Sequence, residues 1–286
     1  MKRFINFLLR TYLFISSASF CLVLATYLLS GQPLKITAVS VLAFFCTLLI
    51  YNLHKVSNLF NEISFSVRFL LTQFKKISFL TKTMIIISLI GILSTIFFIQ
   101  AKTLLCLFPL ALLTLAYSIP FIKVNGKRKR LREILFVKIM SLSLVWAFAT
   151  VWLPLVDCGV NIFSKSSLAI FTERFLFMYA ICVPFEIRDM EQEKKWGIKT
   201  MPQEIGVNAS KISALIALLV FIALCYFQFE NSMDNSKHIF FLPLFLSAAA
   251  AFGLILFSNE KRGSYYFRIF IDGTMQLQFI LLLLFR

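Results

Sequence analysis

The segment at residues 186–202 reads E-I-R-D-M-E-Q-E-K-K-W-G-I-K-T-M-P, and it concentrates acids in a chain with only 13 aspartates and glutamates among 286 residues. Glu186, Asp189 and Glu193 stand at positions i, i+3 and i+7, which share a single stripe if the segment is helical. Like charges on one stripe repel each other. The stripe therefore predicts a hard cation such as Mg²⁺, with a phosphate completing its coordination shell.

The residues after the acids predict where this helix ends. Gly197 is expected to break the helix, and Pro202 is expected to begin the next element. Lys199 and Thr200 lie between them and are candidate donors to a phosphate. The alternative interpretation of the segment is a solvated loop of mixed charges.

The composition of the whole chain is that of a membrane protein. Hydrophobic residues make up 59% of the chain and the mean hydropathy is +0.86, whereas a soluble domain is about half apolar. Apolar runs long enough to cross a bilayer predict an all-α, polytopic bundle of nine transmembrane helices, in one integral membrane domain at residues 1–286. The expected spans are 11–30, 35–53, 83–100, 103–122, 134–156, 168–185, 211–228, 239–258 and 266–285.

The formal charge of +16 is explained by membrane topology, so it does not call for a nucleic-acid partner. With a cytoplasmic N-terminus, most of the 29 lysines and arginines fall in inside segments, as the positive-inside rule predicts. Nine spans then place the C-terminus outside. We expect an integral protein of the bacterial inner (plasma) membrane.

Two inside segments stand out between the spans. Residues 54–82 interleave bases with phenylalanines, which predicts an amphipathic loop or helix on the cytoplasmic membrane surface, in contact with lipids. Residues 186–210 form the cytoplasmic segment that carries the acids. The six cysteines are scattered singly, so neither disulfides nor a zinc site is indicated.

The acidic segment resembles the second aspartate-rich motif of the UbiA superfamily of intramembrane prenyltransferases. That motif is roughly Asp-x-x-Asp-x-x-x-Asp followed by Gly-x-Lys-Thr-x-Pro. Glu186, Asp189 and Glu193 occupy its acidic positions, and residues 197–202 match its tail. The spans and the motif placement extend the resemblance over nearly the whole chain.

The first acidic motif of the family, Asn-Asp-x-x-Asp-x-x-x-Asp, is degenerate in this chain. Asn52 is kept, but Leu53, Val56 and Phe60 stand where the acids belong. Lys55 follows directly, and a lysine can occupy the place of a metal as a point charge. The alternative is that Lys55 is an ordinary anchor at the inner membrane surface.

A third feature also resembles the family. Tyr117-Ser-x-Pro120 is followed by Lys123, and in UbiA enzymes such a lysine lies near the diphosphate. The acidic stripe, Asn52 and Lys123 all fall on the inside face by topology alone. This convergence favours a single site there.

The resemblance implies a prenyltransferase that moves a prenyl group from an isoprenyl diphosphate to a lipophilic acceptor within the membrane. It implies that Glu186, Asp189 and Glu193 are the catalytic acids and hold Mg²⁺, as one ion or two. The residues expected to bind the diphosphate are Lys123, Lys199, Arg188, Asn52, Lys55 and Tyr117.

Two other functions compete with this one. A catalytically inactive relative that binds an isoprenoid lipid or a partner is favoured by the loss of the first acidic motif. A transporter is suggested by charges within spans, but no internal repeat supports it.

Charges inside the expected spans have a structural interpretation beside the functional one. Lys138 and Asp272 lie near the inside face, where they can snorkel to the membrane surface. Asp272 follows Arg268 at i+4 and is expected to pair with it. Glu173 and Arg174 lie in the outside half of the sixth span and are expected to form a structural pair.

Overall fold

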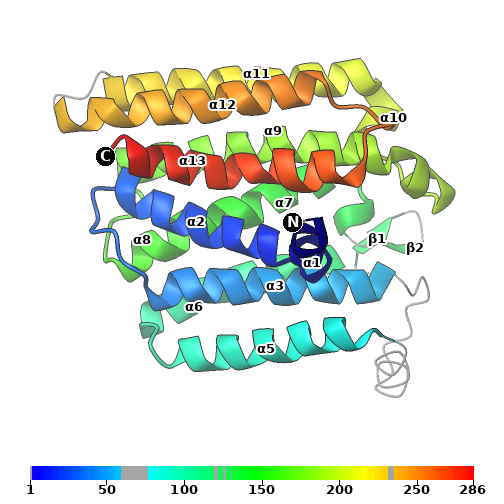
Figure 1. Cartoon of the computed structure of the whole chain (residues 1–286), viewed down its shortest axis with the longest axis horizontal. Helices are drawn as coiled ribbons and strands as arrows, with labels where there is room; N and C mark the ends of the chain where they lie inside the picture. Colours follow the sequence, from blue (N-terminus) through cyan, green and yellow to red (C-terminus); the bar gives the residue numbers. More distant parts are fainter. Residues whose placement is uncertain (1, 59–76, 119–121, 125–126, 130, 231–234) are drawn as a thin grey trace.

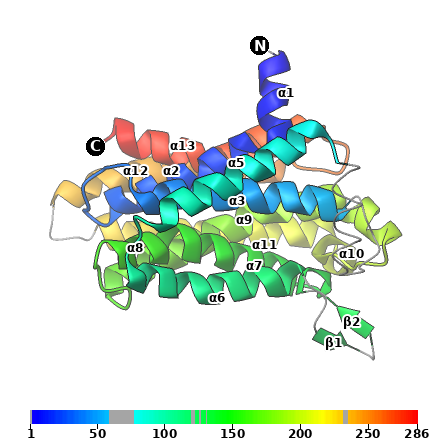
Figure 2. The ribbon, with the colours of Figure 1, turned by 90° about the horizontal axis from the view of Figure 1, so that it is seen from below.

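The computed structural model describes residues 2–58, 77–118, 122–124, 127–129, 131–230 and 235–286. Its long helices lie side by side along one axis, and a small β-hairpin stands at one end of the bundle (Figures 1 and 2). The helices are α1 (Lys2–Thr11), α2 (Leu13–Leu29), α3 (Ala38–Asn58), α5 (Phe79–Ile96), α6 (Ala101–Ser118), α7 (Val137–Ala147), α8 (Leu153–Asp157), α9 (Lys165–Lys195), α10 (Met201–Ile205), α11 (Val207–Cys225), α12 (Phe241–Leu256) and α13 (Asp272–Leu284). The strands are β1 (Ile122–Val124) and β2 (Lys127–Lys129).

Short 3-10 or π-helical turns adjoin several of these helices. A π-helical turn at Phe148–Trp152 joins α7 to α8, and another at Tyr266–Ile271 leads into α13. Apolar chains in a bilayer satisfy their backbone polar groups within helices, which explains why nearly all of the chain is helical. The expected all-α class is confirmed, and the antiparallel β1–β2 pair is its one exception among the described residues.

Seven helical segments of the described chain are long and apolar enough to cross a membrane, and the bent pair α1–α2 makes an eighth if it is one span. The apolar part of α6, Ala101–Thr114, is shorter. In the described part of the chain, each expected span lies mostly on helix, and the chain is an integral membrane protein. The predicted count of nine spans is not confirmed.

The expected surface segment at 54–82 is described only at its two ends. Helix α3 continues to Asn58, and Ser78 caps α5 by accepting a hydrogen bond from the Thr81 backbone N–H. Residues 59–76 lie outside the described part of the chain.

Helices α1 and α2 meet at a sharp bend of 72°. Tyr12 adopts a left-handed conformation there, with φ of 63°, which interrupts the helical hydrogen bonding. The Asn52 side chain donates from Nδ2 to the Thr11 carbonyl oxygen (3.1 Å) and to the Leu48 carbonyl oxygen (2.9 Å). Asn52 therefore ties the bend to α3.

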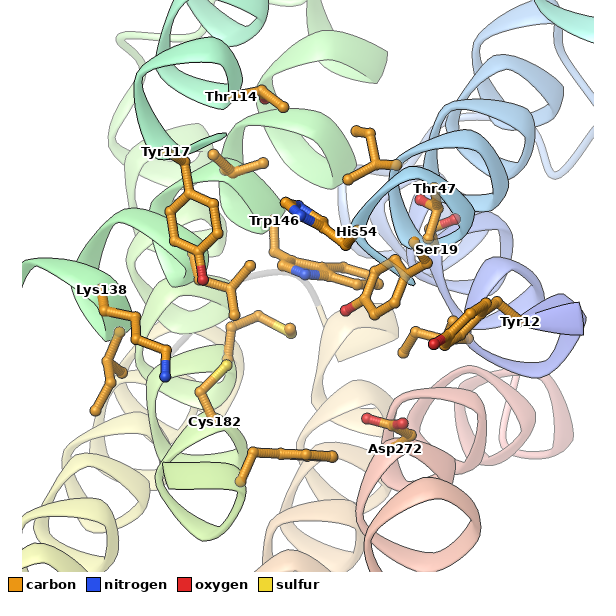
Figure 3. Close-up of a pocket in the computed structure, with 18 of the residues that line it drawn as sticks. Tyr12, Ser19, Thr47, His54, Thr114, Tyr117, Lys138, Trp146, Cys182 and Asp272 are labelled. Carbon is orange, nitrogen blue, oxygen red and sulfur yellow. The ribbon is translucent and has the colours of Figure 1, made fainter. Parts of the chain in front are cut away.

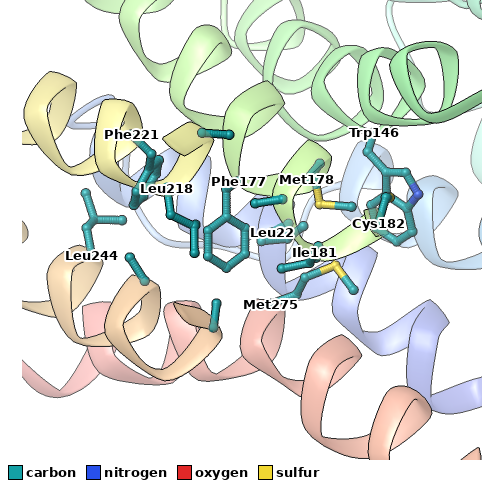
Figure 4. Close-up of a cluster of buried hydrophobic side chains, with 14 of the residues drawn as sticks. Leu22, Trp146, Phe177, Met178, Ile181, Cys182, Leu218, Phe221, Leu244 and Met275 are labelled. Carbon is teal, nitrogen blue, oxygen red and sulfur yellow. The ribbon is translucent and has the colours of Figure 1, made fainter. Parts of the chain in front are cut away.

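The core lies between α2, α7, α9, α11, α12 and α13 (Figure 4). Phe177 of α9 and Phe221 of α11 are almost fully buried, with ring centroids 5.5 Å apart. Leu22, Ile181 and Met275 extend this packing toward the middle of the bundle. The core therefore surrounds α9, the helix that carries the acidic stripe.

Helix α9 ends through a backbone motif that the sequence predicted. The Ile198 N–H donates to the Glu193 carbonyl oxygen and the Gly197 N–H donates to the Lys194 carbonyl oxygen, both at 3.0 Å. Gly197 has φ of 71°, the left-handed conformation that this helix ending requires. The acids thus lie on the last turns of a 31-residue helix, and the segment at 186–210 contains α10 and the start of α11 as well.

Candidate functional site

A cavity of about 1240 Å³ extends along α9 at the end of the bundle where this helix finishes. Its walls come from α1, α2, α3, α6, α7, α9 and the segment that leads into α13. Figure 3 shows Lys138 and Tyr117 on one side of it and Tyr12 and Asp272 on the other. The charged side chains that line the cavity are Lys55, Glu133, Lys138, Glu186, Arg188, Asp189, Glu193, Lys195, Arg268 and Asp272.

The rest of the cavity wall is largely apolar. On α3, α7 and α9 the apolar lining residues precede or follow the charged ones toward the middle of each helix, and α6 contributes apolar residues as well. Leu42, Leu110, Leu142, Trp146 and Met178 are examples. The cavity therefore has a charged mouth and an apolar interior.

Lys138 of α7 lies between two of the three acids in the stripe. Its ammonium Nζ is 2.6 Å from Glu186 Oε1 and 2.5 Å from Glu193 Oε1. The side chains of Lys138, Glu186 and Glu193 are 17%, 7% and 13% exposed, so the three groups are mostly shielded from solvent yet line the cavity. A single internal cation thus neutralises part of the charge of both glutamates.

The third acid of the stripe is paired within α9. Arg188 donates from Nε to Asp189 Oδ1 (2.7 Å) and from Nη2 to Asp189 Oδ2 (2.8 Å). The guanidinium also lies 4.8 Å from the ring centroid of Phe185 and 5.5 Å from that of Phe267. Bidentate pairing and ring stacking hold Arg188 in one orientation at the mouth of the cavity.

This arrangement does not fit a divalent metal ion. Among the described residues, no group of three or more His, Cys, Asp and Glu side chains converges as a metal site would. Oxygens of Glu186 and Glu193 already contact the Lys138 ammonium, and both Asp189 oxygens accept from Arg188. The Mg²⁺ site expected on Glu186, Asp189 and Glu193 stays a prediction.

The other residues predicted for the site fall into two groups. Arg188, Lys55 and Tyr117 line the same cavity as the three acids. The Lys55 ammonium donates to Thr81 Oγ1 (3.2 Å), and the Tyr117 ring contacts the His54 ring at 5.9 Å between centroids. The structure therefore gathers these residues from α3, α6 and α9 around one cavity.

Asn52, Lys199 and Thr200 lie outside this cavity. Asn52 is fully buried at the bend between α1 and α2 and does not line the cavity. Lys199 does not line it either, and its ammonium contacts Glu204 Oε2 (3.3 Å) at the surface. The backbone of Lys123 lies on β1 and pairs with that of Arg128 on β2. Thr200, named above as a donor, is 99% buried where α10 begins.

Lys138, Arg268 and Asp272 line the cavity although the sequence favoured structural roles for them. Arg268 donates to the Leu9 carbonyl oxygen and lies over the Tyr12 ring, 5.1 Å from its centroid. It forms no ion pair with Asp272 in the described chain, so the expected i+4 pair is wrong. The available signal was a charge inside an apolar span, which is costly and often functional.

Comparison with solved structures identifies the fold. A UbiA homologue from Archaeoglobus fulgidus bound to GPP and Mg²⁺ superposes with a TM-score of 0.62 at 16% identity, covering 96% of this chain and 99% of that chain. The same homologue bound to DMAPP and Mg²⁺ gives 0.62 at 15% identity, covering 96% and 98%. A third structure of it, bound to Cd²⁺, gives 0.60 at 17% identity, covering 94% and 97%.

No protein-family model matches the sequence, and no curated protein matches it. The structural likeness covers nearly the full length of both chains, so this chain has the fold of the UbiA homologues. The resemblance noted in the acidic segment predicted this fold, and the prediction is confirmed.

Proposed function

We propose that this chain is a UbiA-type protein that binds an isoprenyl diphosphate in its cavity and transfers the prenyl group to a lipophilic acceptor within the membrane. The observation that carries the proposal is one continuous cavity with a charged mouth and an apolar interior. An isoprenyl diphosphate has the same division, because an anionic head group is attached to a hydrocarbon chain.

The ligands of the structural neighbours support the same class of substrate. GPP and DMAPP are both present in structures that share this fold. Their Mg²⁺ supports the use of a divalent ion by that homologue, whereas the acids of this chain are already paired with bases. We therefore derive the roles below from the chain's own residues.

The transfer breaks the bond between the first prenyl carbon and the bridging oxygen, and the electron pair leaves with the diphosphate. Cations at the mouth of the cavity stabilise that negative charge. Arg188 and Lys55 line the mouth, and Lys123 and Lys199 are further candidates from the sequence. A nucleophilic atom of the acceptor then bonds to the prenyl carbon, and its proton passes to the departing diphosphate or to water.

The proposed orientation follows the distribution of bases. The loops near the charged mouth are the basic segments of the sequence, which favours a cytoplasmic mouth and N-terminus. The substrate then enters from the cytoplasm and the acceptor from the surrounding lipid. This arrangement suits a protein of the bacterial inner membrane.

A second candidate function is binding of an isoprenoid diphosphate without turnover. It is favoured by the pairing of all three acids with Lys138 and Arg188, and by Leu53 and Val56 at positions where the family has acids. Such a protein would keep the cavity and the fold but release no diphosphate.

The decisive experiment measures geranyl diphosphate binding to the purified full chain in detergent by calorimetry. We expect saturable binding, with geraniol and inorganic diphosphate each binding more weakly because each lacks one half of the ligand. Ala149→Trp, which fills part of the apolar wall, is expected to weaken geranyl diphosphate more than dimethylallyl diphosphate.

Turnover is then measured as diphosphate release in the presence of a bacterial lipid extract that supplies acceptors. Release together with a prenylated lipid supports the transferase. Binding without release in any extract favours the second function. Absence of binding overturns both.

A further inference from the structure

The cavity mouth contains one feature that the proposed function does not require. A metal-dependent diphosphate site needs free carboxylate oxygens, and here two of the three acids bracket a lysine from another helix. Lys138 reaches α9 from α7, and its nitrogen lies within 2.6 Å of both Glu186 and Glu193. The ammonium therefore sits between carboxylates, the place that a bound ion would take.

The donor count of Lys138 fits this position. A lysine ammonium has three N–H donors and no acceptor. In the described part of the chain, Glu186 and Glu193 accept two of them, which leaves one donor. Because Lys138 lines the cavity with 17% of its side chain exposed, that donor is available to an oxygen of a ligand (Figure 3).

A divalent ion placed between the two glutamates would compete with the lysine for the same position. An ion bound to Glu186 and Glu193 would occupy the position of the Lys138 ammonium, and the two cations would repel each other at close range. Arg188 holds both oxygens of Asp189 in the same way. Bases thus contact one oxygen of each glutamate and both oxygens of Asp189, while Glu193 Oε2 is buried without a hydrogen-bond partner in the described chain.

We propose that Lys138 takes the place of the metal ion in this chain, bridging the glutamates of α9 to the diphosphate, so that the head group binds without Mg²⁺. This inference rests on the proposed function, because it assigns the head group of the same substrate. Arg188 and Lys55 supply further positive charge at the mouth of the cavity.

The test measures geranyl diphosphate binding to the full chain in detergent, once in EDTA and once in millimolar Mg²⁺. The variants are Lys138→Met, which keeps the length of the side chain without its charge, and the matched control Lys194→Met. Lys194 lies on α9 next to Glu193 but is exposed and does not line the cavity. A second measurement follows Mn²⁺ uptake by electron paramagnetic resonance in the absence of diphosphate.

We expect the native chain and Lys194→Met to bind geranyl diphosphate with Kd values that agree within about twofold in the two media. Lys138→Met is expected to bind about tenfold more weakly in EDTA and to recover in Mg²⁺, because its freed glutamates can hold the ion. The native chain should take up no Mn²⁺, and Lys138→Met should take it up.

A native chain that loses binding by about tenfold or more in EDTA overturns the inference, and so does a native chain that takes up Mn²⁺ as Lys138→Met does. Loss of native binding in EDTA is measured on the native chain alone, so it does not depend on the folding of a variant. Lys138→Gln replaces the methionine variant if the latter is unstable. Absence of geranyl diphosphate binding in both media overturns the proposed function instead. The Mn²⁺ measurement then still decides whether Lys138 occupies the metal position.

Discussion

Helix α9 carries charged side chains in two regions that differ in what surrounds them. Near its middle, Glu173 and Arg174 are 2% and 3% exposed and lie within the packed bundle. Arg174 donates from Nη1 to Gln278 Oε1 of α13 (2.7 Å). Near its end, Glu186 and Glu193 contact Lys138, and all three residues line the cavity.

The comparison separates structural charges from candidate functional ones on a single helix. Glu173 and Arg174 form no ion pair with each other, contrary to the expected structural pair, and neither lines the cavity. Arg174 contacts Gln278 of α13, and Glu173 contacts Cys225 of α11. A charge inside a membrane span is therefore assigned by what it faces, since a charge that contacts only helices contributes to stability and one that lines a cavity can meet a ligand.

The largest expected effect concerns the buried region. Arg174→Met removes the donor to Gln278 Oε1 and leaves that buried oxygen without a partner, which should cost roughly 2 kcal/mol of stability. Thermal unfolding in detergent measures it, with exposed Lys165→Met of the same helix as the control. A Tm equal to that of the control would contradict the assignment of Arg174 to the packed core.

The next effect concerns the cavity end of the same helix. Arg188→Met should weaken geranyl diphosphate binding about tenfold, because Asp189 loses its partner and the mouth loses a positive charge. Arg188→Lys keeps the charge without the bidentate geometry, so its Kd for geranyl diphosphate should lie between those of the native chain and Arg188→Met. Equal Kd values for all three proteins would mean that the arginine is structural, like Arg174.

Asn52 tests the distinction between structural residues and residues that bind the ligand. Asn52→Ala removes the hydrogen bonds to Thr11 and Leu48 and should lower stability by about 1 kcal/mol, with the Kd for geranyl diphosphate unchanged within about twofold. Thermal unfolding and calorimetry on the same sample measure both. A weakened Kd at unchanged Tm would support the role at the diphosphate that the sequence predicted.

The smallest effect concerns the orientation of Arg188. Phe185→Leu removes one of the two rings beside the guanidinium, which is worth about 0.5–1 kcal/mol, so binding should weaken about threefold. Phe245→Leu, on exposed α12 surface, is the matched control. An effect as large as that of Arg188→Met would mean that the ring itself contacts the ligand.

Features that depend on nearby residues were predictable from the sequence. The spans follow from runs of apolar residues, and the end of α9 follows from Gly197, which was expected to break the helix and has a left-handed φ in the structure. Glu186, Asp189 and Glu193 share a stripe because their spacing matches the helical repeat. Lys55 and Tyr117 reach the same cavity because the topology brings their helix ends to one side of the bundle.

Features that depend on contacts between distant residues were not predictable. Asn52 contacts Thr11, 41 residues earlier, only because Tyr12 takes a left-handed conformation at the bend. Lys138 meets Glu193 across 55 residues because α7 packs beside α9. In the sequence, a lysine near the end of a span has the same pattern whether it snorkels to the surface or turns into a cavity.

The sequence by itself determined an all-helical membrane protein and a stripe of three acids at the end of one helix, because hydropathy and helical spacing are local properties of the chain. Only the tertiary structure decided which cations meet that stripe. Lys138 and Glu186 belong to separate helices, and their pairing depends on the packing of α7 against α9. The site is therefore formed by helix packing, because its opposite charges come from helices that are distant in the sequence.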